Sequence, residues 1–151
     1  MKQKGFTLIE LLVVIAIIGL LSTMAVTALN NARQKSRDAK RVSDIKQIQT
    51  ALELFYTDNN SYATSTGTFV ISGGSIATST YKYMNKVPDN PTPNGQTYRY
   101  IPCSGPVAGV YTCNNASTYP ASSYALEYTL EGATGQLAAG QATATPAGIK
   151  N

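Results

Sequence analysis

One carboxylate, Glu10, stands inside an otherwise apolar run near the start of the chain. Residues 6–29 contain no other charged side chain, and Lys2 and Lys4 precede them. A carboxylate inside a membrane-spanning helix costs about 2.5–3.5 kcal/mol unless it lies near the interface or meets a partner. Two interpretations therefore stand: Glu10 reaches the lipid headgroups, or it pairs with a cation of its own chain or an adjacent one.

The rest of the sequence offers little chemistry. The chain has no histidine, so its serines and cysteines lack the usual base, and no glycine-rich phosphate motif occurs. We therefore expect neither enzymatic activity nor a cofactor. Asp89, in "PDNPT", is a weak candidate for a calcium ligand, and otherwise we expect no metal site.

The two cysteines predict a disulfide. Cys103 and Cys113 enclose the short segment "SGPVAGVYT" in a part of the chain rich in turn formers. In an exported protein such a pair is typically oxidised, and closing so small a loop contributes about 2–3 kcal/mol in the chain-entropy picture. The alternative is a pair of buried free thiols.

Basic side chains cluster just after the apolar run. Six of the twelve lysines and arginines lie there: Arg33, Lys35, Arg37, Lys40, Arg41 and Lys46. This pattern argues against nucleic-acid binding, because Asp38 and Asp44 interrupt the cluster and no aromatic residues are interleaved. A charged helical neck beside lipid headgroups, with ion pairs to those aspartates three or four residues away, explains it more simply.

The elements that carry these residues follow from the hydrophobic pattern. No proline occurs before Pro88, and the first strong stop is the turn-forming cluster at Asp58–Ser61. We expect one helix from about Phe6 to Asp58, apolar all round over 6–29 and amphipathic over 30–60. Its inward face is set by residues three or four apart: Val42, Ile45, Ile48, Leu52 and Phe55.

Residues 61–151 predict a small β-rich head, which makes the fold α+β: a long helix packed on an antiparallel sheet. The segment "SYALEYTLE" alternates most clearly, with Tyr124, Leu126, Tyr128 and Leu130 on one face. The segments "TYRYIPC" and "AGVYTC" and residues 69–71 predict further strands. The C-terminal tail has little to bury and is expected to be loose.

The N-terminus resembles a known signal. Lys4-Gly5-Phe6-Thr7-Leu8-Ile9-Glu10, followed by "LLVVIAIIGLL", is similar to the class III signal of type IV pilins and type II secretion pseudopilins. The resemblance is close over residues 1 to about 30 and looser to about residue 62.

That resemblance implies a processing and assembly pathway. A prepilin peptidase would remove leader residues 1–5 by cutting between Gly5 and Phe6, and would methylate the new amino group to give N-methylphenylalanine at Phe6. The chain would wait in the bilayer until membrane assembly machinery drew it into a homopolymeric filament. Glu10 would then pair with the terminal ammonium of a neighbouring subunit and fix the axial register.

The location of the head follows from several features. The basic residues after the apolar run outnumber those before it, which by the positive-inside rule favours a cytoplasmic head. The leader, the cysteine pair and the Ser/Thr-rich composition favour the outside, and we take that orientation: a single pass through the cytoplasmic membrane, then a cell-surface filament. Besides a pilus subunit, the alternatives are a secretion pseudopilin and an anchored minor pilin with a ligand-binding head.

Overall fold

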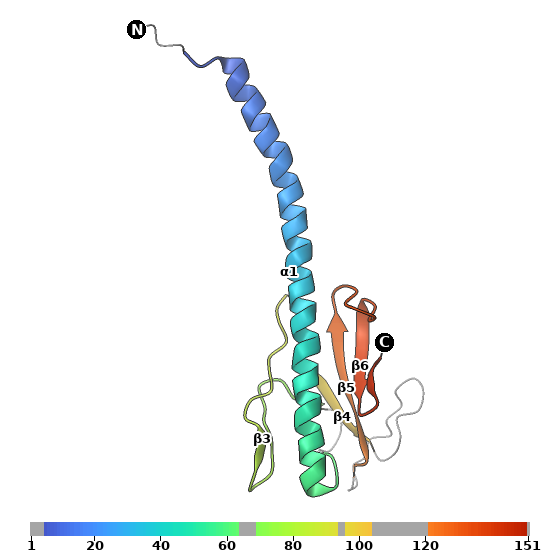
Figure 1. Ribbon diagram of the computed structural model, residues 1–151. Coiled ribbons are helices and arrows are strands. Elements are labelled where there is room, and N and C mark those ends of the chain that lie inside the picture. Colours follow the sequence, from blue (N-terminus) through green and yellow to red (C-terminus); the bar gives the residue numbers. More distant parts are fainter. Residues whose placement is uncertain (1–4, 64–68, 94–95, 104–120, 151) are drawn as a thin grey trace. The chain divides into compact units, whose positions relative to one another are not determined.

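The computed structural model describes residues 5–63, 69–93, 96–103 and 121–150. These residues fall into two compact units, Met1–Ser36 and Arg37–Asn151. Helix α1 (Leu8–Asn59) begins in the first unit and ends in the second (Figure 1). The expected helix is therefore confirmed to within about two residues at each end, the usual uncertainty of helix boundaries.

The first unit is a helix whose apolar side chains face outward on all sides. Its large apolar residues range from 44% exposed at Val14 to 80% at Leu8. By length and composition alone the helix is apolar enough to cross a membrane. Gly19 lies within the helix and causes no break in it. Because so much exposed apolar surface is costly in water, this segment requires lipid or other apolar helices around it.

Hydrogen bonds from Asn59 and Asn60 terminate helix α1. Asn60 adopts a positive φ of 51°, the left-handed conformation that commonly follows a helix. Its N–H donates to the Tyr56 carbonyl at 2.7 Å, and the Asn59 amide donates to the Phe55 carbonyl at 2.8 Å. The predicted stop at Asp58–Ser61 thus acts by satisfying carbonyls that the last helical turn leaves free.

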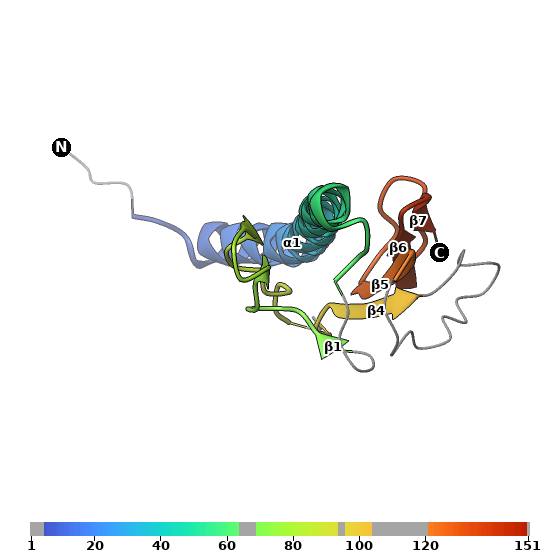
Figure 2. The same cartoon turned by 90° about the horizontal axis from the view of Figure 1, so that it is seen from below.

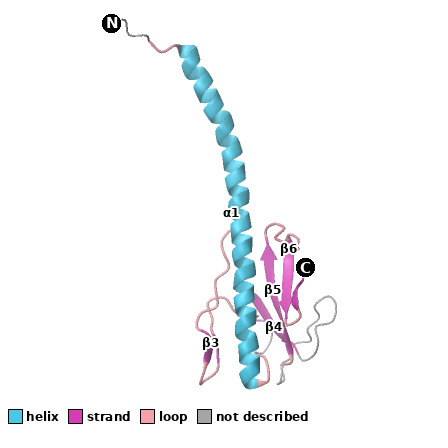
Figure 3. Cartoon of the chain, viewed as in Figure 1, coloured by secondary structure: helices cyan, strands magenta, loops and turns pink. Residues whose placement is uncertain are grey.

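The second unit, which we call the head, contains two antiparallel sheets. The larger sheet has the strand order β1-β4-β5-β6-β7 and packs beside α1 (Figures 2 and 3). Its strands are β1 (Phe69–Val70), β4 (Arg99–Cys103), β5 (Ser123–Leu130), β6 (Gly140–Thr145) and β7 (Gly148–Lys150). The smaller sheet pairs β2 (Ile76–Ala77) with β3 (Lys82–Met84). The predicted α+β class is confirmed.

The core lies between α1 and β5. All four residues predicted for the inner face of β5 are at most 2% exposed: Tyr124, Leu126, Tyr128 and Leu130. They form one cluster with the predicted inward helix residues Ile45, Ile48, Leu52 and Phe55, and Val42 packs at its edge. Burying these side chains is what holds the C-terminal part of α1 on the sheet.

The expectation of a loose C-terminal tail was wrong over Gly140–Lys150. Strands β6 and β7 occupy this segment, and β6 pairs with the whole second half of β5. Ala144 is opposite Leu126 and Ala142 is opposite Tyr128, and both alanines are buried. Small side chains fit here because the large ones opposite them already fill the space, so low hydrophobicity does not predict a free tail.

Candidate functional site: the start of helix α1

The residues predicted for processing lie together and are open to solvent. Gly5 and Phe6 precede α1 in extended chain, and the Phe6 residue is 75% exposed. A Cβ added at Gly5 would meet no atom within 4 Å. Among the described residues nothing requires glycine at that position for steric reasons, which leaves recognition by another protein as the role to test.

Glu10 belongs to a capping box that the sequence reading missed. The Thr7 N–H donates to Glu10 Oε2 at 2.8 Å, and the Thr7 hydroxyl donates to the same oxygen at 2.5 Å. The Glu10 N–H approaches Thr7 Oγ1 at 3.4 Å. The spacing Thr-x-x-Glu before an apolar run is the sequence signature of this motif. Thr7 and Glu10 therefore cap the helix within a single chain.

The capping box uses only one of the two carboxylate oxygens. Every described hydrogen bond to the Glu10 side chain goes to Oε2, so Oε1 keeps its lone pairs for a further donor. A shallow groove of about 390 Å³ beside it is lined by Phe6, Ile9, Glu10, Val13 and Val14. An ammonium group in that groove would meet a carboxylate surrounded by apolar side chains, where charge pairing is stronger than in water.

The predicted charged neck is partly wrong, because Asp38, Arg41 and Asp44 are buried in the head, although the expected ion pair three residues apart does form between Arg41 and Asp38. Arg41 and Asp38 pair at 2.6 Å and are at most 1% exposed. Arg41 also pairs with Glu131 at 2.7 Å and donates to the Asn90 side chain at 2.8 Å. Glu131 in turn accepts from Arg37. The sequence showed the arginines but not their distant partners on the turn after β5 and on the loop before β4.

This cluster of charged residues joins α1 to the turn after β5 and to the loop before β4. Asp38 accepts hydrogen bonds from the backbone N–H groups of Glu131 and Gly132, at 3.0 and 2.8 Å. The hydrogen bond from Arg37, supported by Arg41, lowers the pKa of Glu131 to about 2. Because each buried charge has a counter-charge and hydrogen bonds, the cluster is a structural device and not a nucleic-acid surface.

Asp44 lies apart from the ion pairs. It accepts a hydrogen bond from the Tyr98 hydroxyl at 3.0 Å, and burial raises its pKa above the ordinary value. The same contact and burial raise the pKa of Tyr98. Tyr98 therefore acts as an apolar side chain with one polar end.

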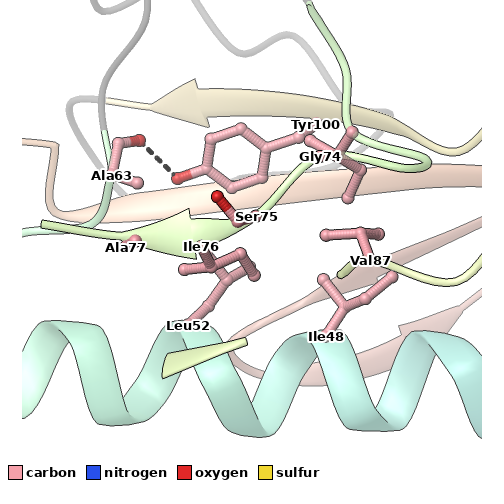
Figure 4. Close-up of a pocket in the computed structure, with 10 residues that line it drawn as sticks. Ile48, Leu52, Ala63, Gly74, Ser75, Ile76, Ala77, Val87 and Tyr100 are labelled. Carbon is pink, nitrogen blue, oxygen red and sulfur yellow. Dashed lines mark hydrogen bonds between the residues drawn. The ribbon is translucent and has the colours of Figure 1, made fainter. Parts of the chain in front are cut away.

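An apolar pocket of about 310 Å³ lies between α1, β4 and the β2–β3 hairpin. Ile48 and Leu52 from α1 point toward Ile76 and Val87, and the Tyr100 hydroxyl donates to the Ala63 carbonyl (Figure 4). No described residue in its lining is charged. The pocket is a gap under the hairpin, without the convergent polar groups that mark a specific ligand site.

The remaining site predictions are only partly covered by the described residues. Cys103 is buried at the end of β4, and Cys113 lies outside the described residues, so the disulfide stays a prediction. Asp89 forms an exposed ion pair with Lys86 at 3.1 Å. Over the described part of the chain, no three His, Cys, Asp or Glu side chains gather as a metal site would need.

The N-terminal segment of the chain matches a known protein family. Residues 1–26 match the family model described as the prokaryotic N-terminal methylation motif. This segment contains the predicted cleavage residues Gly5 and Phe6 and the capping residues Thr7 and Glu10, and the predicted resemblance to pilins and pseudopilins is confirmed there.

Individual relatives come from secretion systems and fimbriae. The chain is 44% identical over 64 residues to the type II secretion system core protein G of Escherichia coli K12, which is 42% of this chain and 44% of the relative. The corresponding protein of Aeromonas hydrophila is 42% identical over 64 residues, 42% of this chain and 45% of the relative. The type IV major fimbrial protein FimA of Dichelobacter nodosus is 43% identical over 56 residues, 37% of this chain and 36% of the relative.

The chain thus matches these relatives over less than half of their length. None of the three names denotes an enzyme. No solved structure matches the chain.

Proposed function

We propose that this chain is a structural subunit of a type IV pilus-like filament, assembled through its N-terminal helix after removal of residues 1–5. The observation that carries the proposal is the first unit, in which an apolar helix exposed on every side begins inside the segment that matches the methylation motif, residues 1–26. Such a helix is stable in a bilayer or among copies of itself, and both environments are stages of filament assembly.

Assembly replaces lipid around the helix with neighbouring helices. Association of apolar helices in lipid is driven mainly by packing and polar contacts, because the lipid is as apolar as the helix. A charge pair between Glu10 and a neighbour's Phe6 ammonium would supply such a contact. Methylation of that ammonium keeps its charge and reduces its hydration, which favours entry into the apolar groove beside Glu10.

The capping box gives this pair a defined geometry. Thr7 holds the Glu10 carboxylate through Oε2 and leaves Oε1 available. The residue that receives the neighbour is therefore oriented before the neighbour arrives, which lowers the entropy lost on pairing. The proposed partners are other copies of the chain, a prepilin peptidase with methyltransferase activity, the membrane assembly machinery and the bilayer before assembly.

A second candidate function is that of a type II secretion pseudopilin. The relatives named core protein G favour it, while the match to a major fimbrial protein favours a pilus. Both are filament subunits that use the same N-terminal helix, and they differ in whether the filament extends from the cell surface. In either case we place the head outside the cytoplasmic membrane.

The experiment is to express the chain in a host with a prepilin peptidase and assembly machinery, shear the cells and image the sheared fraction by electron microscopy. A pilus subunit dominates the sheared filaments, whereas a pseudopilin stays with the cell envelope. A Gly5→Leu variant is the matched control, because a Cβ at Gly5 meets no described atom within 4 Å. Filaments built from unprocessed Gly5→Leu protein would contradict the proposal.

A further inference from the structure

A basic groove lies on the head between α1 and the last strand of the sheet. Its volume is about 810 Å³, with Val42, Lys46 and Gln49 on one side and Leu137, Ile149 and Lys150 on the other. Strand β7 pairs on one side with β6 and is last in the strand order, so no described strand pairs with its other edge. No acidic side chain is among the described residues that line this groove.

A second surface, the acidic end of α1, has the opposite charge. Glu53 and Asp58 flank Leu54 in the last two turns of the helix, and all three are exposed. Leu54 is 53% exposed, and Tyr81 is the other large apolar side chain left exposed among the described residues of the head. An exposed leucine between two carboxylates suits a basic groove with apolar walls.

The charges of these two surfaces have no ion-pair partner among the described residues of the head. Glu53 accepts hydrogen bonds from neutral tyrosine hydroxyls, as does Asp58. The other described carboxylates of the head are ion-paired or buried: Asp38, Asp44, Asp89, Glu127 and Glu131. Neither Lys46 nor Lys150 forms an ion pair with any described residue. Glu53 and Asp58 at the end of α1 and Lys46 and Lys150 in the groove are thus opposite charges without an ion-pair partner among the described residues of the same head.

One head cannot bring its own two surfaces together. Lys46 and Leu54 are eight residues apart on the same rigid helix, which separates them by about 12 Å along its axis and turns them about 80° apart. The contact requires a second copy. We propose that the acidic end of α1 in one subunit docks in the basic groove of the next, an inference that rests on the proposed function.

Such a contact joins two different patches of identical subunits. A contact of this kind builds an open helical assembly when its rotation does not close a ring, whereas a two-fold contact would stop at a dimer. The head contact therefore adds a second interface to the one made by the N-terminal helices. The occupant of the basic groove is another copy of this chain.

The test is a charge reversal in the full-length chain, measured as the yield of sheared filaments relative to membrane-bound protein. Lys46→Glu and Asp58→Lys should each lower the yield about tenfold, because each places like charges together. The double variant restores opposite charges and should return the yield to within about twofold of the unsubstituted chain. Lys82→Glu on exposed strand β3 is the matched control and should change nothing. An unchanged thermal unfolding temperature of the head in each full-length variant excludes misfolding as the cause of a lower filament yield.

A cross-link tests the contact directly. In filaments of the Leu54→Cys/Ile149→Cys double variant, oxidation should give a ladder of covalent multimers. Neither variant with only one of these substitutions should give the ladder. Normal filaments from every charge variant, without a ladder, would overturn the head contact and leave the proposed function standing. A cross-link to a different protein, or to a closed dimer only, would also overturn it. If the unsubstituted chain forms no filaments, the proposed function fails, and this inference fails with it.

Discussion

Replacing Glu10 by glutamine separates the two roles of this side chain. Glutamine is accepted at the third helical position of a capping box, so Glu10→Gln keeps the hydrogen bond from the Thr7 N–H. It removes the charge that the neighbouring ammonium needs. Glu10→Ala removes both, and Thr7→Ala removes the capping hydroxyl while keeping the charge.

The expected magnitudes of the two losses differ. Loss of a helix cap costs about 0.5–2 kcal/mol. Leaving one charge of a buried pair without its partner costs about 3–5 kcal/mol, which corresponds to more than a hundredfold in an equilibrium constant. We therefore expect Glu10→Gln to reduce assembly nearly as much as Glu10→Ala, and Thr7→Ala to reduce it by about tenfold.

The assay compares sheared filaments with membrane-bound subunit by immunoblot for each variant. Membrane levels should not fall in Glu10→Gln, because removing a charge lowers the cost of insertion. Asp89→Asn in the head is the matched control for loss of one carboxylate. Filaments of Glu10→Gln at the unsubstituted level, together with loss in Thr7→Ala, would refute charge pairing and leave capping as the only role of Glu10.

Three further predictions concern the stability of the head. Because the folded pKa of Glu131 lies at about 2, below its ordinary value of 4.5, its contribution to stability is present above pH 4.5 and is lost as the pH falls toward 2. The free energy of unfolding in urea should therefore differ less between pH 7 and pH 3 in Glu131→Gln than in the unsubstituted chain, by about 2–3 kcal/mol at most, and an equal pH dependence would contradict this. Arg41→Met leaves Asp38 buried without its cation and should lower the unfolding free energy by about 3–5 kcal/mol, whereas a loss under about 1 kcal/mol would show that the cluster is dispensable. Ala144→Leu overpacks the contact with Leu126 and should cost about 1–3 kcal/mol by thermal or urea unfolding, a cost that a loose tail would not show.

The sequence predicted what depends on local pattern. The helix, its inward face and the inner face of β5 followed from residues three or four apart and from strict alternation, because these periods decide which side chains a helix or strand can bury. The Thr7–Glu10 capping box is equally local but was not predicted, because the apolar surroundings of Glu10 indicated a role for its charge alone. Its signal, threonine three residues before glutamate at the start of a helix, was present in the sequence.

What the sequence could not predict depends on distant partners. Arg41 looked like part of a solvated neck until Glu131, ninety positions away in the chain, proved to pair with it at 2.7 Å. Strand β6 looked too poor in large apolar side chains to dock, yet its alanines fit against β5. In both cases the tertiary neighbour, and not local propensity, decides the outcome.

The central claim is that the chain functions as a processed subunit joined to its neighbours through the start of α1. Mass spectrometry of the N-terminal peptide from assembled material tests it most directly, since processing and assembly must both have occurred. We expect a subunit that begins at Phe6 and carries one methyl group on its amino nitrogen. Assembled material that still begins at Met1 would contradict it.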